Sequence, residues 1–304
     1  MKKKIYLFLG LSLLFTACTK DDDILPMPSN PSVPVSQIDP FAALPKETAI
    51  PDSNFEKALI EKGLDIALDG KVTTSNVSYL TELLITESKG IQSIKGIESF
   101  ISLTKMRIER QQLKEIDISK NINLEFLSFW DNRSLSKLDV SKNTKLQILV
   151  LSNVDMETID LSSNIALRVA DFNNIDYSEY GKTKGIKEID FSKNINLERV
   201  YFANNRLKEL DLTKNPKMTD VWYRDNPELI SLKLPGTTPL KMVIGTNNPK
   251  LEFLDLKGSY PQSVRTDNNP KLKSIRVTSL SWLDSHFNQY NGSWSKDDHT
   301  TYIQ

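Results

Sequence analysis

One pattern of apolar residues recurs through most of this 304-residue chain and limits how it can fold. In NINLERVYFANNRLKELDLTKN, from Asn194 to Asn215, apolar residues follow Leu197 at the third and fifth positions and an asparagine follows at the eighth. The same spacing restarts at Leu207 and ends in Asn215. We call the version that begins at Leu197 the first phrase and the version that begins at Leu207 the second phrase.

The first phrase recurs along the chain at a nearly constant interval. Its copies begin at Leu80, Leu103, Leu124, Leu146, Leu167, Leu197, Met218, Leu240 and, more weakly, Pro261. Successive copies are 21 to 23 residues apart, except that an insertion separates Leu167 and Leu197 by 30 residues. Such a period predicts a solenoid, in which each repeat forms one coil and stacked coils bury a shared core.

Within each first phrase, the apolar residues at positions +3 and +5 alternate with residues that face solvent, which predicts a short strand. An asparagine recurs at position +8, where the strand ends and the chain must turn inward. These residues are Asn132, Asn205, Asn226, Asn248 and Asn269. Their side-chain amides can satisfy backbone groups of the turn and hold the coils in register. Gln111, Val154 and Ile175 replace the asparagine in three copies.

The Leu-x-x-Leu-x-Leu-x-x-Asn pattern of residues 80–278 resembles leucine-rich repeat proteins. The resemblance implies a β-rich, right-handed superhelix with parallel strands on the concave face, where this family commonly binds partners. IPDSNFEKALIEKGLD, from Ile50, and the LDVSKN-type phrases also resemble surface-exposed leucine-rich repeat lipoproteins of Bacteroidetes.

The first coil of a solenoid needs a cap, because its apolar interior would otherwise be exposed. Ser53 and Glu56 have the spacing of a capping box, and Gly63 suits a helix exit. We therefore predict a capping helix from Ser53 to Lys62 within an N-terminal cap of residues 51–79. Little other helix is expected.

Residues 279–304 break the period and are predicted to form a C-terminal cap. Their aromatic residues, Trp282, Phe287, Tyr290, Trp294 and Tyr302, are expected to cover the last coil. Asp297, Asp298 and His299 are expected to lie in a flexible tail rather than to bind a metal.

The N-terminal sequence MKKKIYLFLGLSLLFTAC has the basic start, short apolar run and small residues of a secretory signal, here residues 1–17. Phe15 to Cys18 resembles a bacterial lipobox, which implies that Cys18 is lipidated and anchors the chain to a membrane. The following CTKDDD resembles the export tag of Bacteroidetes surface lipoproteins. Residues 18–50 are rich in proline and predict a poorly ordered tether. We therefore expect an outer-membrane lipoprotein displayed on the cell surface.

The outward residues of the two phrases differ in variety. In the second phrase they are nearly the same in every coil, with Asp117, Asp139, Asp160, Asp190 and Asp211 in one row. Water and chain geometry explain such uniformity, and lysines nearby suggest a solvated ladder of charges.

In the first phrase the outward residues differ between coils, and several are aromatic or arginine. Trp, Tyr and Arg dominate binding hot spots because they combine large contact areas with polar groups. The residues that we predict to bind a partner are Arg107, Phe126, Trp130, Asp171, Tyr201, Trp222 and Arg224.

Three alternatives remain open at this stage. The outward aromatic residues could stack on each other across coils and stabilise the sheet without binding anything. They could also form platforms for sugar rings, with Asp171 bonding hydroxyl groups, so a glycan is the alternative to a protein or peptide partner. The insertion NNIDYSEYGKTKG, residues 173–185, could be an inert loop or could place Tyr177 over the binding face.

The sequence offers little for catalysis. It has two histidines and one cysteine, Cys18, and contains neither a phosphate-binding glycine loop nor a zinc-protease motif. Net charge is +0, which gives no bias toward nucleic acid. We predict a monomeric, non-enzymatic binding protein with no cofactor, no metal and no nucleic-acid partner.

Overall fold

The computed structural model describes residues 41, 44–174, 185–236, 239–286 and 294–304. They belong to one compact unit, Pro40–Gln304. The predicted signal, the lipidation site Cys18 and most of the predicted tether lie outside the described residues. So do Tyr177 and most of the insertion, as well as Phe287 and Tyr290.

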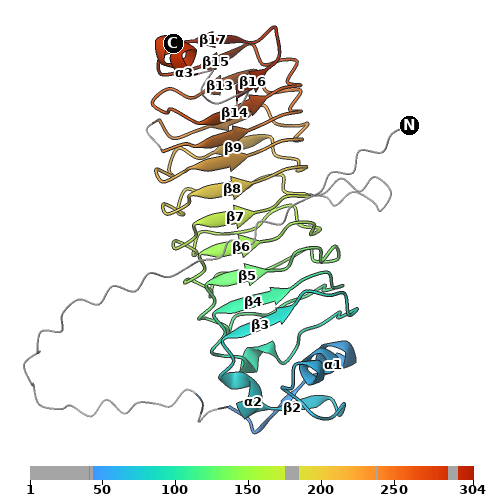
Figure 1. The fold of residues 1–304 in the computed structure, drawn as a ribbon. Helices are drawn as coiled ribbons and strands as arrows, with labels where there is room; N and C mark the ends of the chain where they lie inside the picture. Colours follow the sequence, from blue (N-terminus) through green and yellow to red (C-terminus); the bar gives the residue numbers. More distant parts are fainter. Residues whose placement is uncertain (1–40, 42–43, 175–184, 237–238, 287–293) are drawn as a thin grey trace, which may run out of the picture. The chain divides into compact units, whose positions relative to one another are not determined.

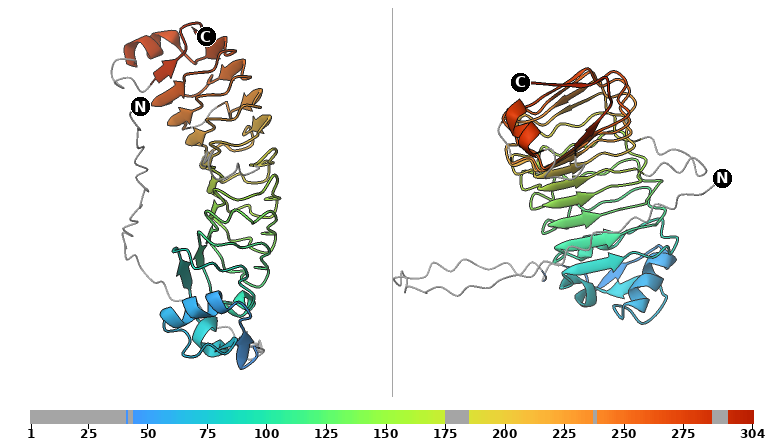
Figure 2. Two further views of the ribbon diagram at one scale, coloured as in Figure 1. Left: turned by 90° about the vertical axis from the view of Figure 1, so that its right-hand side faces the viewer. Right: turned by 45° about the horizontal axis from the view of Figure 1, so that its top comes forward.

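Short strands stack along this unit into a ten-stranded sheet (Figure 1). They are β3 (Glu82–Ile85), β4 (Lys105–Ile108), β5 (Phe126–Ser128), β6 (Ile148–Val150), β7 (Val169–Asp171), β8 (Arg199–Tyr201), β10 (Asp220–Trp222), β12 (Met242–Ile244), β14 (Ser263–Thr266) and β16 (Trp294–Lys296). All neighbouring pairs are parallel. The unit bends gently, and this sheet lines the inner side of the bend (Figure 2). The fold is therefore the predicted leucine-rich repeat solenoid.

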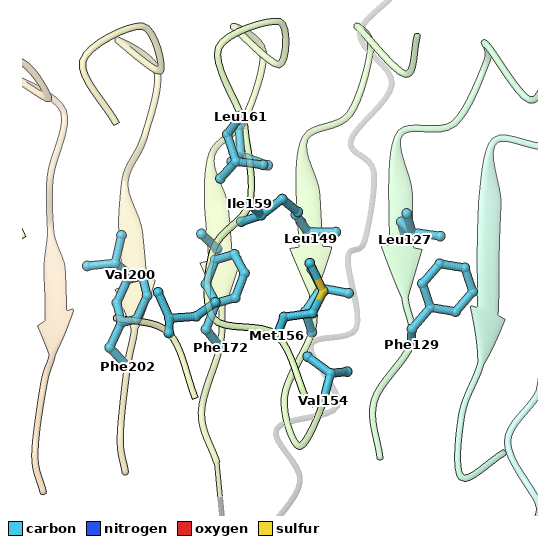
Figure 3. Packing of buried hydrophobic residues seen from close by; sticks show 14 of the residues in the cluster. Leu127, Phe129, Leu149, Val154, Met156, Ile159, Leu161, Phe172, Val200 and Phe202 are labelled. Atoms are coloured by element: carbon cyan, nitrogen blue, oxygen red, sulfur yellow. The ribbon is translucent and has the colours of Figure 1, made fainter. Parts of the chain in front are cut away.

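The core consists of the residues that the period places inside. In the coil that begins at Leu197, Leu197, Val200 and Phe202 are fully buried. Phe202 stacks on Phe172 of the preceding coil with ring centroids 5.2 Å apart, and both lie in the continuous cluster of Figure 3. The +3 residues of neighbouring coils are register partners, as Val200 and Val221 show. The predicted strands and core positions are confirmed.

The asparagines at position +8 are buried and hydrogen-bonded to backbone, as predicted. The Asn226 amide donates to the carbonyl oxygens of Phe202 and Tyr223 at 2.8 and 2.9 Å. Its own backbone N–H donates to Asn248 Oδ1 at 3.0 Å, which links it to the next coil. Gln111, which replaces the asparagine in one coil, donates to the carbonyl oxygens of Glu87 and Glu109.

A second row of asparagines runs through the ends of the second phrases. It consists of Asn121, Asn143, Asn164, Asn194 and Asn215, all fully buried. The side-chain amide of each donates to two carbonyl oxygens of the preceding coil at 2.8 to 3.1 Å. Coils that carry both asparagines, such as the one with Asn205 and Asn215, are therefore held to a neighbouring coil at both inward turns.

The residue at position +7 of the first phrase has a left-handed backbone in most coils, a feature that the sequence analysis did not anticipate. Values of φ lie between 55° and 61° at Arg110, Asp131, Asn153, Asn204, Asp225, Asn247 and Asn268. Asn and Asp tolerate this conformation better than other residues with a side chain, which explains why they dominate the row.

The N-terminal cap contains the predicted helix, but the predicted capping box is wrong. Helix α1 is Ser53–Glu61, and its N-cap is Asp52, whose side chain accepts from the backbone N–H groups of Asn54 and Phe55. Glu56 instead accepts from backbone N–H groups of residues 69–71. Gly63 has a φ of 69°, as expected for a helix exit. Elements β2 (Lys71–Thr73) and α2 (Thr74–Ser78) also belong to the cap, β1 (Glu47–Ala49) precedes it and pairs with β2, and the 3-10 turn η1 (Ile97–Ser99) follows β3.

The second phrases form strands only toward the C-terminus. There, β9 (Glu209–Asp211) pairs with β11 (Ser231–Lys233), and β13 (Phe253–Asp255), β15 (Ser274–Arg276) and β17 (Thr301–Ile303) form a separate sheet. The aspartate row is more than a solvated ladder of charges, because each carboxylate closes a turn. Asp139 Oδ1, for example, accepts from the Ser141 backbone N–H at 2.8 Å, and Asp117, Asp160, Asp190 and Asp211 do the same two residues on.

The C-terminal segment continues the solenoid rather than only covering it. Strand β16 pairs with β14 and β17 pairs with β15, which adds another coil. Helix α3 (Leu280–His286) comes before it. Trp282, Trp294 and Tyr302 pack edge to face as predicted for a cap. The expectation that Asp297 lies in a flexible tail is wrong, since its carboxylate accepts from the backbone N–H groups of residues 268 and 269.

Gly245 occupies a +5 position that most coils fill with a large apolar residue. The fully buried ring of Tyr223 lies in the space where a Gly245 side chain would project. We expect Gly245→Ala to lower the free energy of unfolding by about 1 to 3 kcal/mol, because overpacking forces a buried ring to move. Urea denaturation followed by circular dichroism measures the change.

Gly236→Ala is the matched control, because a β-carbon at Gly236 would meet nothing within 4 Å. Its free energy of unfolding should change by less than about 0.5 kcal/mol. Equal effects of the two substitutions would contradict the packing that we describe.

Candidate functional site

One side of the ten-stranded sheet packs on the core, and the other side faces solvent on the inner side of the bend (Figure 2). On this solvent-facing side, the residues at position +4 of each first phrase form one row, because the strands are in register. Register partners along this row are Arg107, Ser128, Val150, Asp171, Tyr201, Trp222, Ile244 and Arg265. In each strand these residues alternate with buried ones, as Val221 and Tyr223 flank Trp222. We call this surface the ten-stranded face.

Tyr201 and Trp222 are neighbours on β8 and β10, as the repeat spacing predicted. Their ring centroids are 5.4 Å apart and their planes meet at 81°. Both side chains are partly exposed. The rings stabilise each other across the strands and still present surface to solvent, so stacking and binding are compatible uses of the same pair.

Trp130 and Phe126 lie at a distance from this pair. Phe126 begins β5, three strands before β8, which corresponds to roughly 14 Å at the usual strand spacing. Trp130 packs against the guanidinium of Arg110, 4.7 Å from the ring centroid. The sequence analysis missed Arg110, because Arg110 is at position +7 of its phrase and Trp130 is at position +6 of the next, so the two are not equivalent positions of the repeat.

Arg107 is held in place by a buried acid. Its guanidinium donates to both Glu109 carboxylate oxygens, at 2.9 and 3.0 Å. Glu109 is only 4% exposed and also accepts from the Ser128 hydroxyl at 2.5 Å. The sequence did not single out Glu109, yet it fixes the one predicted arginine at this end of the face.

Asp171 is partly buried next to Tyr201 in the register. One of its carboxylate oxygens accepts from the Ser152 hydroxyl at 2.7 Å and from the Asn173 backbone N–H at 3.0 Å. Burial raises the pKa of Asp171 above its ordinary value, and the two hydrogen bonds only partly oppose this. Ionised Asp171 is therefore a charge that the fold tolerates at a cost.

Arg224 lies two residues after Trp222 and is partly exposed. Its Nε atom is 3.8 Å from a carboxylate oxygen of Asp225, a loose ion pair. The structure thus brings Asp171, Tyr201, Trp222 and Arg224 onto three neighbouring strands or their ends. Arg107, Phe126 and Trp130 form a separate group on β4 and β5, and Tyr177 lies outside the described residues.

Three further observations on the described residues concern metal ligands, membrane-spanning helices and surface hollows. No group of three or more His, Cys, Asp or Glu side chains that could hold a metal ion occurs among them. None of their helices is both long and apolar enough to span a membrane. Two hollows, of about 720 and 490 Å³, lie between second-phrase segments and are open to solvent. Lysines and carboxylates such as Lys137 and Asp139 line the larger one.

The chain folds as a parallel-strand solenoid with leucine-rich repeat spacing. Neither protein-family models nor curated proteins gave a match to the chain. Matching solved structures include internalin C2 of Listeria monocytogenes, with 17% identity, a TM-score of 0.46, and coverage of 77% of this chain and 99% of that chain. Internalin InlF of the same species has 15% identity, a TM-score of 0.39, and coverage of 82% and 96%. Listeria monocytogenes InlP has 16% identity, a TM-score of 0.40, and coverage of 75% of this chain and 64% of that chain.

Asp171→Asn and Asp139→Asn are expected to change stability in opposite directions. Burial raises the pKa of Asp171, so its ionisation costs stability as pH rises, and the Asn variant should exceed the wild type at about pH 7. The Ser141 backbone N–H and hydroxyl lower the pKa of Asp139. Its charge therefore stabilises the fold above the unfolded pKa of about 3.9, and the Asn variant should be less stable at about pH 7.

Urea denaturation at about pH 7 and about pH 3 provides the measurement, because both differences should shrink as the carboxylates become protonated. Asn retains an oxygen that can accept the same backbone hydrogen bonds, so each substitution tests the charge. A shift of both variants in the same direction at neutral pH would contradict the assignment.

Proposed function

We propose that this chain is a non-enzymatic binding protein that recognises a protein or peptide through its ten-stranded face. The observation that carries the proposal is the Tyr201–Trp222 pair, which is partly exposed at the centre of a sheet whose other side is packed. Tyr and Trp are enriched among the few hot-spot residues that dominate the binding energy of protein interfaces. Solubility alone would favour small polar residues there, as in the second phrases.

The surroundings of the pair suit a protein interface. Val150 and Ile244 extend the apolar row on either side of Asp171, Tyr201 and Trp222. The backbone beneath is fixed by hydrogen bonds between coils, such as the Phe202 N–H to the Trp222 carbonyl oxygen at 2.7 Å. A preformed surface loses little conformational entropy when it binds.

The glycan alternative has weaker support from this geometry. A sugar ring stacks on a flat aromatic surface, whereas the Tyr201 and Trp222 planes meet at 81° and form no continuous platform. The same residues could still contact a glycan, so a glycan array probed with the full chain distinguishes the two ligand classes.

The proposal also places the protein at the surface of a cell. Its support is the sequence alone: the basic and apolar start of the chain, the lipobox-like residues before Cys18 and the CTKDDD segment. A lipid-anchored solenoid on a tether would present the ten-stranded face to molecules outside the cell.

Tyr201→Ala and Trp222→Ala are expected to weaken capture of the partner by about thirtyfold or more each, the effect of losing about 2 kcal/mol at a hot spot. The full chain and its variants serve as bait against extracellular proteins, and captured proteins are compared by quantitative mass spectrometry. Circular dichroism checks that each variant is folded.

Ile195→Ala is the matched control, because Ile195 is a large exposed residue, at 56% exposure, that lies outside the ten-stranded face. It should leave capture unchanged. If the Tyr201 and Trp222 variants fold and retain every protein that the wild type captures, the ten-stranded face is not the binding surface.

Cys18→Ala is expected to abolish incorporation of labelled palmitate and to release the protein from the membrane fraction, because acyl chains would provide the anchor. Thr19→Ala should retain both properties. A wild-type chain that incorporates no label would rule out lipidation at Cys18.

A further inference from the structure

Carboxylates on and beside the ten-stranded face are mostly neutralised by cations of the chain itself. The ion pairs are Glu82–Lys105 at 3.4 Å, Glu109–Arg107 at 2.9 Å, Glu198–Arg168 at 2.9 Å and Asp225–Arg224 at 3.8 Å. The face thus follows a general rule that a charge in a partly desolvated position has a counter-charge nearby.

Asp171 departs from this rule. Both groups that hydrogen-bond to it, the Ser152 hydroxyl and the Asn173 N–H, are neutral. Within the described parts of the chain, no lysine or arginine nitrogen lies within 4 Å of its carboxylate oxygens. This partly buried carboxylate therefore lacks the positive charge that its neighbours on the face possess.

The residues around Asp171 leave a net negative charge. On the adjoining strands, Arg199 and Asp220 are register partners in the neighbouring row. With Asp171, two acidic residues and one basic residue lie in this part of the face, a formal net charge of −1. An anionic ligand would be repelled here, whereas a cation would restore neutrality.

The aromatic pair supplies the second part of a cation site. Tyr201 is the register partner of Asp171, and Trp222 packs on Tyr201 from the next strand. Aromatic faces carry partial negative charge and attract ammonium and guanidinium groups. Val150 and Ile244, which flank Asp171, Tyr201 and Trp222 in the same row, can contact the methylene groups of a long basic side chain.

We propose that Asp171, Tyr201 and Trp222 form a subsite that receives a lysine or arginine side chain of the protein partner. The inference rests on the proposed function, since it specifies the chemistry of a ligand on the ten-stranded face. The cation would pair with the Asp171 carboxylate and lie against the aromatic rings, while the rest of the partner contacts the apolar row.

The test begins with a random peptide library displayed on phage and selected on the immobilised full chain. Selected peptides should be enriched in lysine or arginine. For one such synthetic peptide, replacing the basic residue by norleucine removes the charge but keeps the stem. Fluorescence anisotropy should show affinity for the wild-type chain falling by about tenfold or more.

A double-mutant cycle assigns that effect to Asp171. Asp171→Asn retains the shape of the side chain, and the basic peptide should bind this variant about tenfold more weakly than wild type. Replacing the basic residue of the peptide by norleucine should then lower its affinity for the variant by less than about twofold. Asp139→Asn removes a charge outside the ten-stranded face and should behave as wild type. Asp171→Asn is expected to stay folded, as argued above.

The possible failures are distinguishable. If selected peptides lose affinity for Trp222→Ala but lack basic residues, or bind Asp171→Asn as tightly as wild type, the cation subsite is wrong and the proposed function stands. If selected peptides bind Trp222→Ala and Tyr201→Ala as tightly as wild type, the ten-stranded face is not the binding surface and both proposals fail.

Discussion

The solenoid depends on hydrogen bonds from buried asparagine side chains to backbone carbonyl groups at the inward turns of its coils. A turn inside a protein leaves carbonyl groups without partners, and a buried polar group without a partner costs about 1 to 3 kcal/mol. Asn226 and Asn215 each provide an amide that reaches such groups, including those of the preceding coil. The apolar core fills the space between these turns, and the hydrogen bonds between neighbouring coils favour one register of the stack.

This arrangement separates the residues that maintain the fold from those that can vary. The buried residues and the asparagines are constrained in every coil, and the aspartates of the second phrases are also constrained, since residues such as Asp139 close turns. Most outward residues of the ten-stranded sheet are not constrained by the core or by the turns. Asp171 illustrates the result, because its partly buried charge disfavours the folded state and yet suits recognition of a cation.

Much of the fold can be predicted from the local spacing of apolar residues. The wrong or missing predictions concern individual side-chain contacts, which the spacing does not determine. Leu197, Val200 and Phe202 reveal their buried positions within six residues of sequence. By contrast, Asp52 rather than the predicted Ser53 caps helix α1. Asp297 binds backbone in the last coil, where helix α3 interrupts the period. Two other contacts that the spacing did not predict join neighbouring coils and depend on side-chain direction. They are the hydrogen bond from Ser152 to Asp171 and the packing of Arg110 on Trp130. The spacing of the repeat predicts which residues lie on a face, but it does not determine which side chains contact each other there.

The close approach of Tyr223 and Gly245 has a consequence for how such a chain can evolve. Solenoids lengthen by duplicating whole repeats, which works when coils are interchangeable. The coil that contains Tyr223 can be followed only by one that leaves room for its ring, so a duplicated copy of that coil alone would collide with its twin. Growth of the array at this junction would require the two coils to be copied together as a pair.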